Sequence, residues 1–139
     1  FKLLHGILAC NENLKKWKIK GSNMCDVCEH VQSIQHLLFD CAYVKPLWHK
    51  VNQCFHINIT FKHILGIDHT SEFNNVFTII SFFIYKEWLL RSLECKKRNQ
   101  NIRMDFYRAE LIFRVNVYKR CKTIDENNIV LLEHLVKHL

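Results

Sequence analysis

The sequence has few of the residues that make turns: it contains one proline and three glycines among 139 residues. So little turn chemistry disfavours a fold of many short strands joined by tight turns. Leu, Ile, Phe, Lys and Glu dominate instead, a composition that favours helices. The apolar fraction of 49% is enough to build a core. We therefore predict a mainly α protein, a small helical domain.

The sequence also lacks an apolar run long enough to cross a membrane. Eight of the ten positions from Val76 to Tyr85 are apolar, but Lys86 and Glu87 then interrupt the run. A bilayer requires about 20 such residues. We therefore expect no membrane segment, and we interpret the run as a central helix buried on most of its sides.

No catalytic motif is present. The scattered acidic residues form no carboxylate cluster with a lysine of the nuclease type, and the histidines have no Ser or Cys partner in a recognisable arrangement. We therefore expect this segment not to be an enzyme. Its first residue is Phe1 and not Met, so we expect the chain to be part of a longer polypeptide.

Basic residues outnumber acidic ones, and the excess is concentrated in one part of the sequence. Between Lys86 and Lys122 there are eleven basic and four acidic residues, an excess of seven that equals the formal charge of the whole chain, +7. Such clusters suit phosphate groups, although a solvated helix surface is the alternative. Trp17 and Trp88 are either base-stacking residues or, as their spacing favours, core residues. The candidate nucleic-acid contacts are Lys15, Lys16, Lys18, Lys20, Lys96, Lys97, Arg98 and Arg103.

Seven cysteines make an odd number, and no signal-peptide pattern accompanies them. Because three of them lie in one metal-type cluster, a disulfide framework is the less favoured interpretation. We expect a reducing compartment inside the cell, nuclear or cytoplasmic. The remaining thiols are predicted to be small buried hydrophobes; they are Cys10, Cys54, Cys95 and Cys121.

The metal-type cluster consists of Cys25, Cys28, His36 and Cys41, separated by gaps of two, seven and four residues. The gap of two lets two thiolates of one tight turn reach a single tetrahedral zinc ion, and the other two ligands return from a short helical segment. By sequence spacing alone, Cys54 could replace His36 as the fourth ligand. His36 is preferred because it lies nearer to the other ligands in the sequence. Four protein ligands leave no open position, so we predict one structural Zn²⁺ in an embedded CCHC zinc knuckle.

Apolar spacing predicts the helices before and after this knuckle. A leading helix is expected around residues 3–8, and a second, capped by Asn11 or Asn13, is expected to end at Gly21. Ser33 is a plausible cap for the turn that bears His36. Another helix should cover residues 44–55, with Pro46 in its first turn, and a short one should cover 61–65.

Three longer helices are predicted after residue 70. The first should run from Ser71 to about residue 98. Its core positions are predicted to be Val76, Phe77, Ile80, Phe83, Ile84, Trp88 and Leu89. Asp105 should cap the second helix, with a core stripe of Phe106, Ala109, Ile112 and Val115. Asp125 should cap the last, with apolar positions at Ile129, Leu132, Leu135, Val136 and Leu139.

Taken together, residues 3–48 resemble a known domain. A Leu-Leu-His-Gly segment, the paired cysteines, His36-Leu-Leu-Phe-Asp-Cys41 and Trp48 occur in the order seen in the zinc-binding domain near the C-terminus of non-LTR (LINE-type) retrotransposon reverse transcriptases. Tyr85-Lys86-Glu87-Trp88 is similar to a later segment of that family. The chain departs from it at Gln32 and Ser33, where an acidic residue is more usual.

The resemblance implies a function that the residues alone do not give. It implies zinc ligation by Cys25, Cys28, His36 and Cys41, and a role in handling element RNA or target DNA during target-primed reverse transcription, beside the remainder of the polymerase. The aspartate pair of a polymerase palm is absent from this segment. We predict a zinc-binding domain over residues 1–55 and a helical extension over 56–139 that packs on it, so that the two form one continuous fold. The alternative is a structural or protein-interaction domain that zinc only stabilises.

Overall fold

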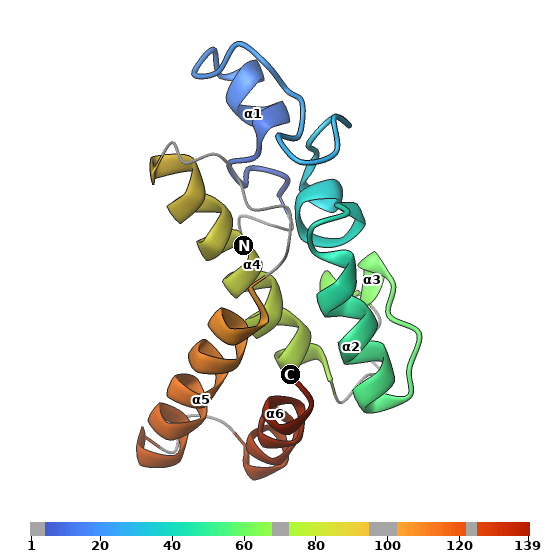
Figure 1. Ribbon diagram of the computed structural model, residues 1–139, viewed down its shortest axis with the longest axis vertical. Helices are drawn as coiled ribbons and strands as arrows, with labels where there is room; N and C mark the ends of the chain where they lie inside the picture. The colour runs from blue at the N-terminus through green and yellow to red at the C-terminus, as the bar shows by residue number, and fades with distance from the viewer. Residues whose placement is uncertain (1–4, 68–72, 95–102, 122–124) are drawn as a thin grey trace. The chain divides into compact units, whose positions relative to one another are not determined.

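The computed structural model describes residues 5–67, 73–94, 103–121 and 125–139, and these form helices joined by loops (Figure 1). No strand occurs within these ranges; one isolated bridge pairs Met24 with Val31. The mainly α prediction is therefore confirmed. The elements in chain order are α1 (Asn11–Lys16), η1 (His36–Asp40), α2 (Lys45–Phe55), α3 (Phe61–Ile64), α4 (Asn74–Glu94), α5 (Met104–Cys121) and α6 (Glu126–His138).

The chain divides into two compact units, each made of two stretches of sequence. One unit combines Phe1–Pro46 with Ile84–Ile102, and the other combines Leu47–Phe83 with Arg103–Leu139. Helix α4 thus contributes its second half, from Ile84, to the first of these units and its first half, up to Phe83, to the second. The predicted division at residue 55 stays a prediction.

The leading helix is absent from the described part of its predicted range. Residues 5–9 are not helical, and Gly6 has a φ of 65°, in the left-handed region that interrupts a helix. The buried side chain of Asn13 donates hydrogen bonds to the carbonyl oxygens of Gly6 (2.8 Å) and Leu8 (2.7 Å). Asn13 therefore fixes this loop and does not cap α1, for which Cys10 is the N-cap residue.

Helix α1 is shorter than predicted. It ends at Lys16 and not at Gly21, and Lys18 already has a left-handed φ of 59°. Left-handed residues commonly follow the last turn of a helix. As a result Trp17 lies at the helix end with 46% of its surface exposed, so the prediction that it is a core residue is wrong.

The core of the first unit forms where the segment after the knuckle meets the second half of α4. Tyr43, Ile84 and Trp88 are buried, and the Tyr43 hydroxyl donates a 2.5 Å hydrogen bond to the carboxylate of Glu87, which is itself only 4% exposed. Trp88 stacks on Tyr85 with ring centroids 5.8 Å apart. The buried position of Trp88 confirms that it is a core residue.

The core of the second unit combines α2 with the first half of α4. Pro46 lies in the first turn of α2, as predicted, and Leu47, Trp48 and Val51 are buried. The Trp48 ring meets Phe77 edge to face at 6.3 Å. Helix α3, predicted over residues 61–65, follows a capping box formed by the Thr60 side chain.

Helix α4 buries the predicted stripe with one exception. Val76, Phe77, Ile80, Phe83, Ile84 and Trp88 are all buried, but Leu89 is 37% exposed, so its assignment to the core is wrong. Leu89 directly follows Trp88 in the sequence, and Trp88 occupies the buried face of this turn of α4. The predicted cap Ser71 and the predicted end near residue 98 lie outside the described residues. No described helix is both long enough and apolar enough to span a membrane.

Helices α5 and α6 pack side by side in the second unit (Figure 1). The buried stripe of α5 is Tyr107, Leu111 and Val115, so three of the four predicted core positions are wrong; Ala109 and Ile112 are exposed and Phe106 is only partly buried. Asp105 lies inside the first turn of α5 and is not its cap. Asp125 is the N-cap residue of α6, although its side chain forms no capping hydrogen bond. Leu132 and Leu135 are buried, as predicted.

Candidate metal centre

The structure brings together the four predicted zinc ligands in the first unit. The donor atoms of Cys25, Cys28, His36 and Cys41 all lie within 4.8 Å of one another. The Cys41 Sγ is 3.7 Å from the Cys25 Sγ and 3.8 Å from the Cys28 Sγ, and the Cys28 Sγ is 3.1 Å from the His36 Nε2. Two thiolates bound at about 2.3 Å to one tetrahedral ion are about 3.8 Å apart. The group therefore has the size of a zinc site, and Cys54 is not part of it.

The first two ligands are held by a tight turn. The Cys25 amide donates to the His30 carbonyl (2.7 Å), the Glu29 amide donates to the Cys25 carbonyl (3.2 Å), and Glu29 adopts a left-handed φ of 55°. The bridge between Met24 and Val31 closes the base of this loop. His30 is exposed and its ring bonds the carbonyl of Cys28, so it is a loop residue outside the ligand group.

The other two ligands are positioned by η1, a short π-helical segment. The Ser33 hydroxyl accepts a hydrogen bond from the His36 amide at 3.1 Å, which confirms Ser33 as the residue that caps this turn. The Cys41 amide donates to the His36 carbonyl at 2.8 Å, an i to i+5 bond. A π-helical turn brings residues five apart next to each other, and this places the two ligands at the same side.

One side of the site is embedded in the core. Cys25 and Cys41 are 3% and 5% exposed and border a small internal space. Its other lining residues, all in the first unit, are Val27, Gln32, Leu37, Tyr43, Val44, Ile84 and Trp88. Cys28 and His36 instead line an open hollow together with Asp40 and Lys45. The ligands therefore lie at the boundary between the core and the surface of their unit.

The thiols of the site compete for negative charge. The hydrogen bond from Cys41 lowers the pKa of Cys25 to about 3, while the same hydrogen bond and burial raise the pKa of Cys41. One thiolate is thus stabilised at the expense of its neighbour. A divalent cation removes this conflict because it favours the thiolate form of every cysteine ligand. The donor set of three sulfurs and one imidazole is one that Zn²⁺ prefers.

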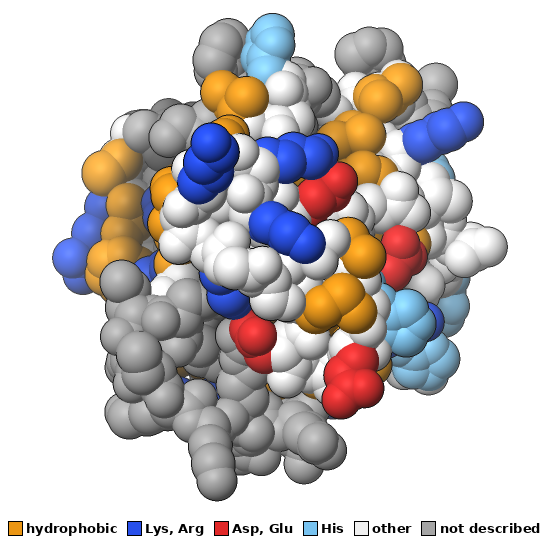
Figure 2. Space-filling view, turned by 90° about the horizontal axis from the view of Figure 1, so that it is seen from above, with side chains coloured by type: hydrophobic (Ala, Val, Ile, Leu, Met, Phe, Trp, Pro, Cys, Tyr) orange, Lys and Arg blue, Asp and Glu red, His pale blue; other side chains and the backbone are white. Residues whose placement is uncertain are grey.

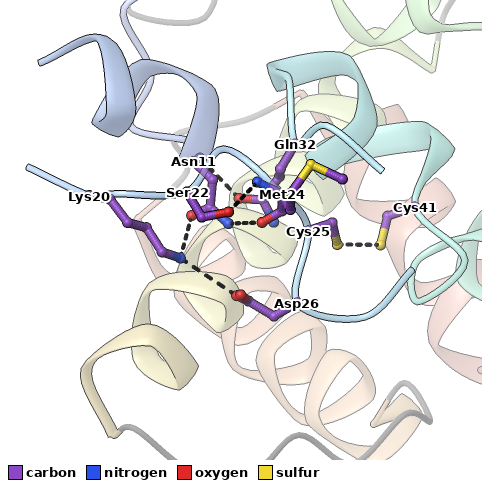
Figure 3. Close-up of polar contacts among 8 residues, drawn as sticks. All are labelled: Asn11, Lys20, Ser22, Met24, Cys25, Asp26, Gln32 and Cys41. Atoms are coloured by element: carbon purple, nitrogen blue, oxygen red, sulfur yellow. Dashed lines mark hydrogen bonds and ion pairs between the residues drawn. The ribbon is translucent and has the colours of Figure 1, made fainter. Parts of the chain in front are cut away.

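A network of buried amides ties the knuckle to α1 (Figure 3). The Asn11 side chain donates a hydrogen bond to the Met24 carbonyl at 2.6 Å, and the backbone amide of Asn11 donates one to the Gln32 Oε1 at 3.1 Å. Lys20 reaches the Asn11 side-chain oxygen (2.9 Å) and Asp26 (3.7 Å). Asn11 therefore links α1 to the knuckle and is not the predicted helix cap. Gln32 is one of its partners.

Replacing Gln32 with alanine is expected to destabilise the first unit. Gln32 is 2% exposed, and its loss would leave the buried Asn11 amide without this acceptor, which costs about 1–3 kcal/mol in the free energy of unfolding. Gln35→Ala is the matched control, because Gln35 is exposed and bonds only Asp40 in the described contacts. Its effect should stay within about 0.5 kcal/mol. Equal losses for both variants in urea unfolding would contradict the role of Gln32.

Residues 1–48 match the family described as zinc-binding in reverse transcriptase. The matched residues contain all four predicted ligands, whose donor atoms lie close enough together to hold one metal ion. Neither a curated protein nor a solved structure matches the chain.

The predicted nucleic-acid contacts that precede the knuckle fall into two kinds. Lys15 and Lys18 are exposed, whereas Lys16 pairs with Glu12 at 2.9 Å and Lys20 is held by Asn11 and Asp26. Figure 2 shows basic side chains lying among hydrophobic and acidic ones on one face. Of the remaining candidates, Arg103 is exposed, and Lys96, Lys97 and Arg98 lie outside the described residues. The positions of the described candidates do not decide whether these residues form one binding site.

The other cysteines differ in their environments. Cys10 and Cys54 are buried, and burial raises the pKa of each thiol. These two are small buried residues, as predicted. Cys121 is exposed, so its prediction is wrong: it is the last residue of α5, beyond the buried stripe that ends at Val115. Cys95 lies outside the described residues.

Proposed function

We propose that this chain is a nucleic-acid-binding zinc module from the C-terminal part of a non-LTR retrotransposon reverse transcriptase. It would hold element RNA or target DNA during target-primed reverse transcription, beside the rest of the polymerase polypeptide, in the nucleus or cytoplasm. The observation that carries the proposal is the exposure of Trp17, which stands between the exposed Lys15 and Lys18 just before the zinc loop. Aromatic residues interleaved with basic ones form the stacking and phosphate contacts of single-strand binding surfaces.

In this proposal one zinc ion has a structural role and the segment is not an enzyme. Four protein ligands occupy all positions of a tetrahedral ion, and so neither water nor substrate has a place on it. The ion would fix the loop from Cys25 to Cys41 and hold it against the core. Gln32 of that loop in turn accepts a hydrogen bond from the backbone amide of Asn11, the first residue of α1. The zinc site would thereby keep α1, with Trp17 at its end, in one orientation relative to the knuckle.

The basic residues would supply affinity for phosphate. Lys15 and Lys18 present free surface in the described structure, and Arg103 is also exposed; Lys96, Lys97 and Arg98 would add three more charges. Lys16 and Lys20 are engaged with acidic side chains, and each must give up that pair before it can bind phosphate. We therefore expect Lys15 and Lys18 to contribute more than the other two lysines. Binding of this kind weakens as the salt concentration rises.

Trp17→Ala is expected to weaken the binding of a labelled single-stranded RNA or DNA by about 5- to 150-fold, the loss of one stacked base at about 1–3 kcal/mol. Binding should be measured by fluorescence anisotropy at several salt concentrations, with the wild-type affinity falling as salt rises. Ile19→Ala is the control, because Ile19 is an exposed apolar residue two positions away (70% exposed) that cannot stack on a base.

Two outcomes would contradict the proposal. If the wild-type chain retains neither RNA nor DNA at low salt, the nucleic-acid function fails. If Trp17→Ala and Ile19→Ala weaken binding equally, Trp17 does not act by stacking. A third outcome, retention of RNA over DNA or the reverse, would identify which nucleic acid the module handles.

A protein-interaction domain is the second candidate function, and a different observation favours it. Ile19, Met24 and Val31 are 70%, 40% and 46% exposed, and all three lie around the knuckle in the first unit. Apolar side chains gathered on a surface are typical of protein contacts. In that case zinc would only stabilise a helical domain that packs against the rest of the polymerase or another protein. Loss of salt-dependent RNA and DNA binding, with retained binding of the polymerase polypeptide, would support this candidate.

A further inference from the structure

We propose that the second unit carries another metal site, formed by Cys54, His134 and His138, which binds Zn²⁺ or a divalent cation of similar ligand preference. Cys54 comes from α2 and the two histidines come from α6. One donor atom of each lies within 4.8 Å of the other two. The site is separate from the knuckle in its ligands, and nothing in the proposed nucleic-acid function requires it.

Helix geometry places the two histidines correctly for one ion. Residues four apart on an α-helix face the same side, and the His134 and His138 rings have centroids 4.4 Å apart. The His134 ring also contacts Phe55 at 6.1 Å, so the residue after Cys54 already packs against this part of α6. Two elements separated by about 80 residues in sequence therefore converge at these three side chains.

The hydrogen bond of His138 prepares its other nitrogen for a metal. The Nδ1 of His138 lies 2.9 Å from the His134 carbonyl oxygen, and because a carbonyl only accepts, Nδ1 must be the protonated nitrogen that donates. The Nε2 of His138 then keeps its lone pair. Metal-binding histidines usually donate their second nitrogen to a backbone carbonyl or carboxylate in this way, which fixes the tautomer and the ring orientation.

The donor chemistry suits a borderline-soft divalent ion. Thiolate and imidazole groups are both zinc ligands, and three protein ligands leave the fourth position of a tetrahedral zinc ion open for water. Cys54 is 6% exposed and burial raises the pKa of its thiol, so binding would replace the thiol proton by the cation and release that proton to solvent. Sulfur and nitrogen ligands of one tetrahedral ion are about 3.6 Å apart. The exposed His134 and His138 side chains have room to close the difference.

An ion at this site would join α2 to α6. It would bind the folded second unit and not the unfolded chain, and so would raise the midpoint of unfolding in proportion to the logarithm of the metal concentration. The open fourth position distinguishes this site from the closed knuckle. A water molecule would occupy it in the isolated chain.

The test is a titration of the whole chain with Co²⁺ after the knuckle has been filled with one equivalent of Zn²⁺. The expected result is a second bound equivalent with the visible absorption of tetrahedral Co²⁺ and a thiolate-to-cobalt charge-transfer band. Cys54→Ser should lose the charge-transfer band, and His134→Gln or His138→Gln should weaken binding by more than about tenfold. Cys121→Ser and His49→Gln are the matched controls, since both residues are exposed and lie outside the group.

Two results would overturn the proposal. The first is a wild-type chain that binds a single equivalent of metal, and this equivalent is lost in Cys28→Ser; the bound metal then belongs to the knuckle, and the second site does not bind metal. The second is a second equivalent whose affinity and spectrum are the same in His134→Gln and in His49→Gln. The histidine variants keep the test valid if Cys54→Ser, a buried substitution, fails to fold, because both histidines are on the surface.

Discussion

Cys28→Ser is expected to release the knuckle zinc and to unfold the segment from residue 22 to residue 48. Zinc supplies about 10–16 kcal/mol to small sites of this type, while a whole domain is stable by only about 5–15 kcal/mol. Serine offers no thiolate, and three ligands would then remain for an ion that needs four in a structural site. We expect the same result for His36→Ala. The apolar wall that α4 contributes, formed by Ile84 and Trp88, would lose the loop that covers it.

Metal content and unfolding measured on the same samples check this prediction. Purified Cys28→Ser should contain less zinc than the wild type and show a lower unfolding midpoint, with loss of amide protection from residue 22 to residue 48. Cys121→Ser is the control for removing a thiol, because Cys121 is exposed and outside the cluster. A wild-type chain that is stripped by a chelator and unfolds at an unchanged midpoint would refute the structural role of zinc.

Trp48→Ala is expected to lower the free energy of unfolding of the second unit by about 3–5 kcal/mol, the usual result of emptying a buried tryptophan site. Trp48 is 3% exposed and packs edge to face on Phe77. Trp17→Ala makes the same chemical change at a surface position, 46% exposed, and should alter stability by no more than about 0.5 kcal/mol.

Urea unfolding followed by circular dichroism distinguishes the two tryptophans. The Trp48 variant should show a markedly lower midpoint, and the Trp17 variant should coincide with the wild type while losing nucleic-acid affinity. Similar midpoints for both variants would contradict the burial of Trp48. The pair thus separates a residue that holds the fold from one that is proposed to act on the surface.

The ligands of the knuckle could be predicted from sequence because their geometry is local. Cys25 and Cys28 share one turn, and His36 and Cys41 share one short helix, so the gaps along the chain nearly determine the distances in space. The site of Cys54, His134 and His138 could not be predicted in this way. Only the spacing of four between the two histidines was a usable signal, and the position of Cys54 depends on how α2 and α6 pack.

The errors in the helices have a physical cause as well. Helix α5 carries apolar or aromatic side chains on several sides, among them Phe106, Tyr107, Ile112 and Phe113. Such a pattern does not determine which side is buried. Tertiary packing against α6 selects Tyr107, Leu111 and Val115 and leaves Phe113 63% exposed. At the N-terminus, the apolar spacing of residues 3–8 suggested a helix, but Gly6 adopts a left-handed conformation that a helix does not accept.

The second half of α4 has a consequence for how this zinc region can be inherited or transplanted. Ile84 and Trp88 line the same internal space as Cys25 and Cys41, and Glu87 accepts a hydrogen bond from the Tyr43 hydroxyl. A peptide cut at residue 48, where the family match ends, would carry every metal ligand but would lack the side chains that shield two of them from water. The knuckle therefore cannot be transferred to another protein without the part of α4 that shields it. Recombination that moves the knuckle into another protein must also transfer the helix that lies some forty residues downstream, or the recipient protein must supply an equivalent helix.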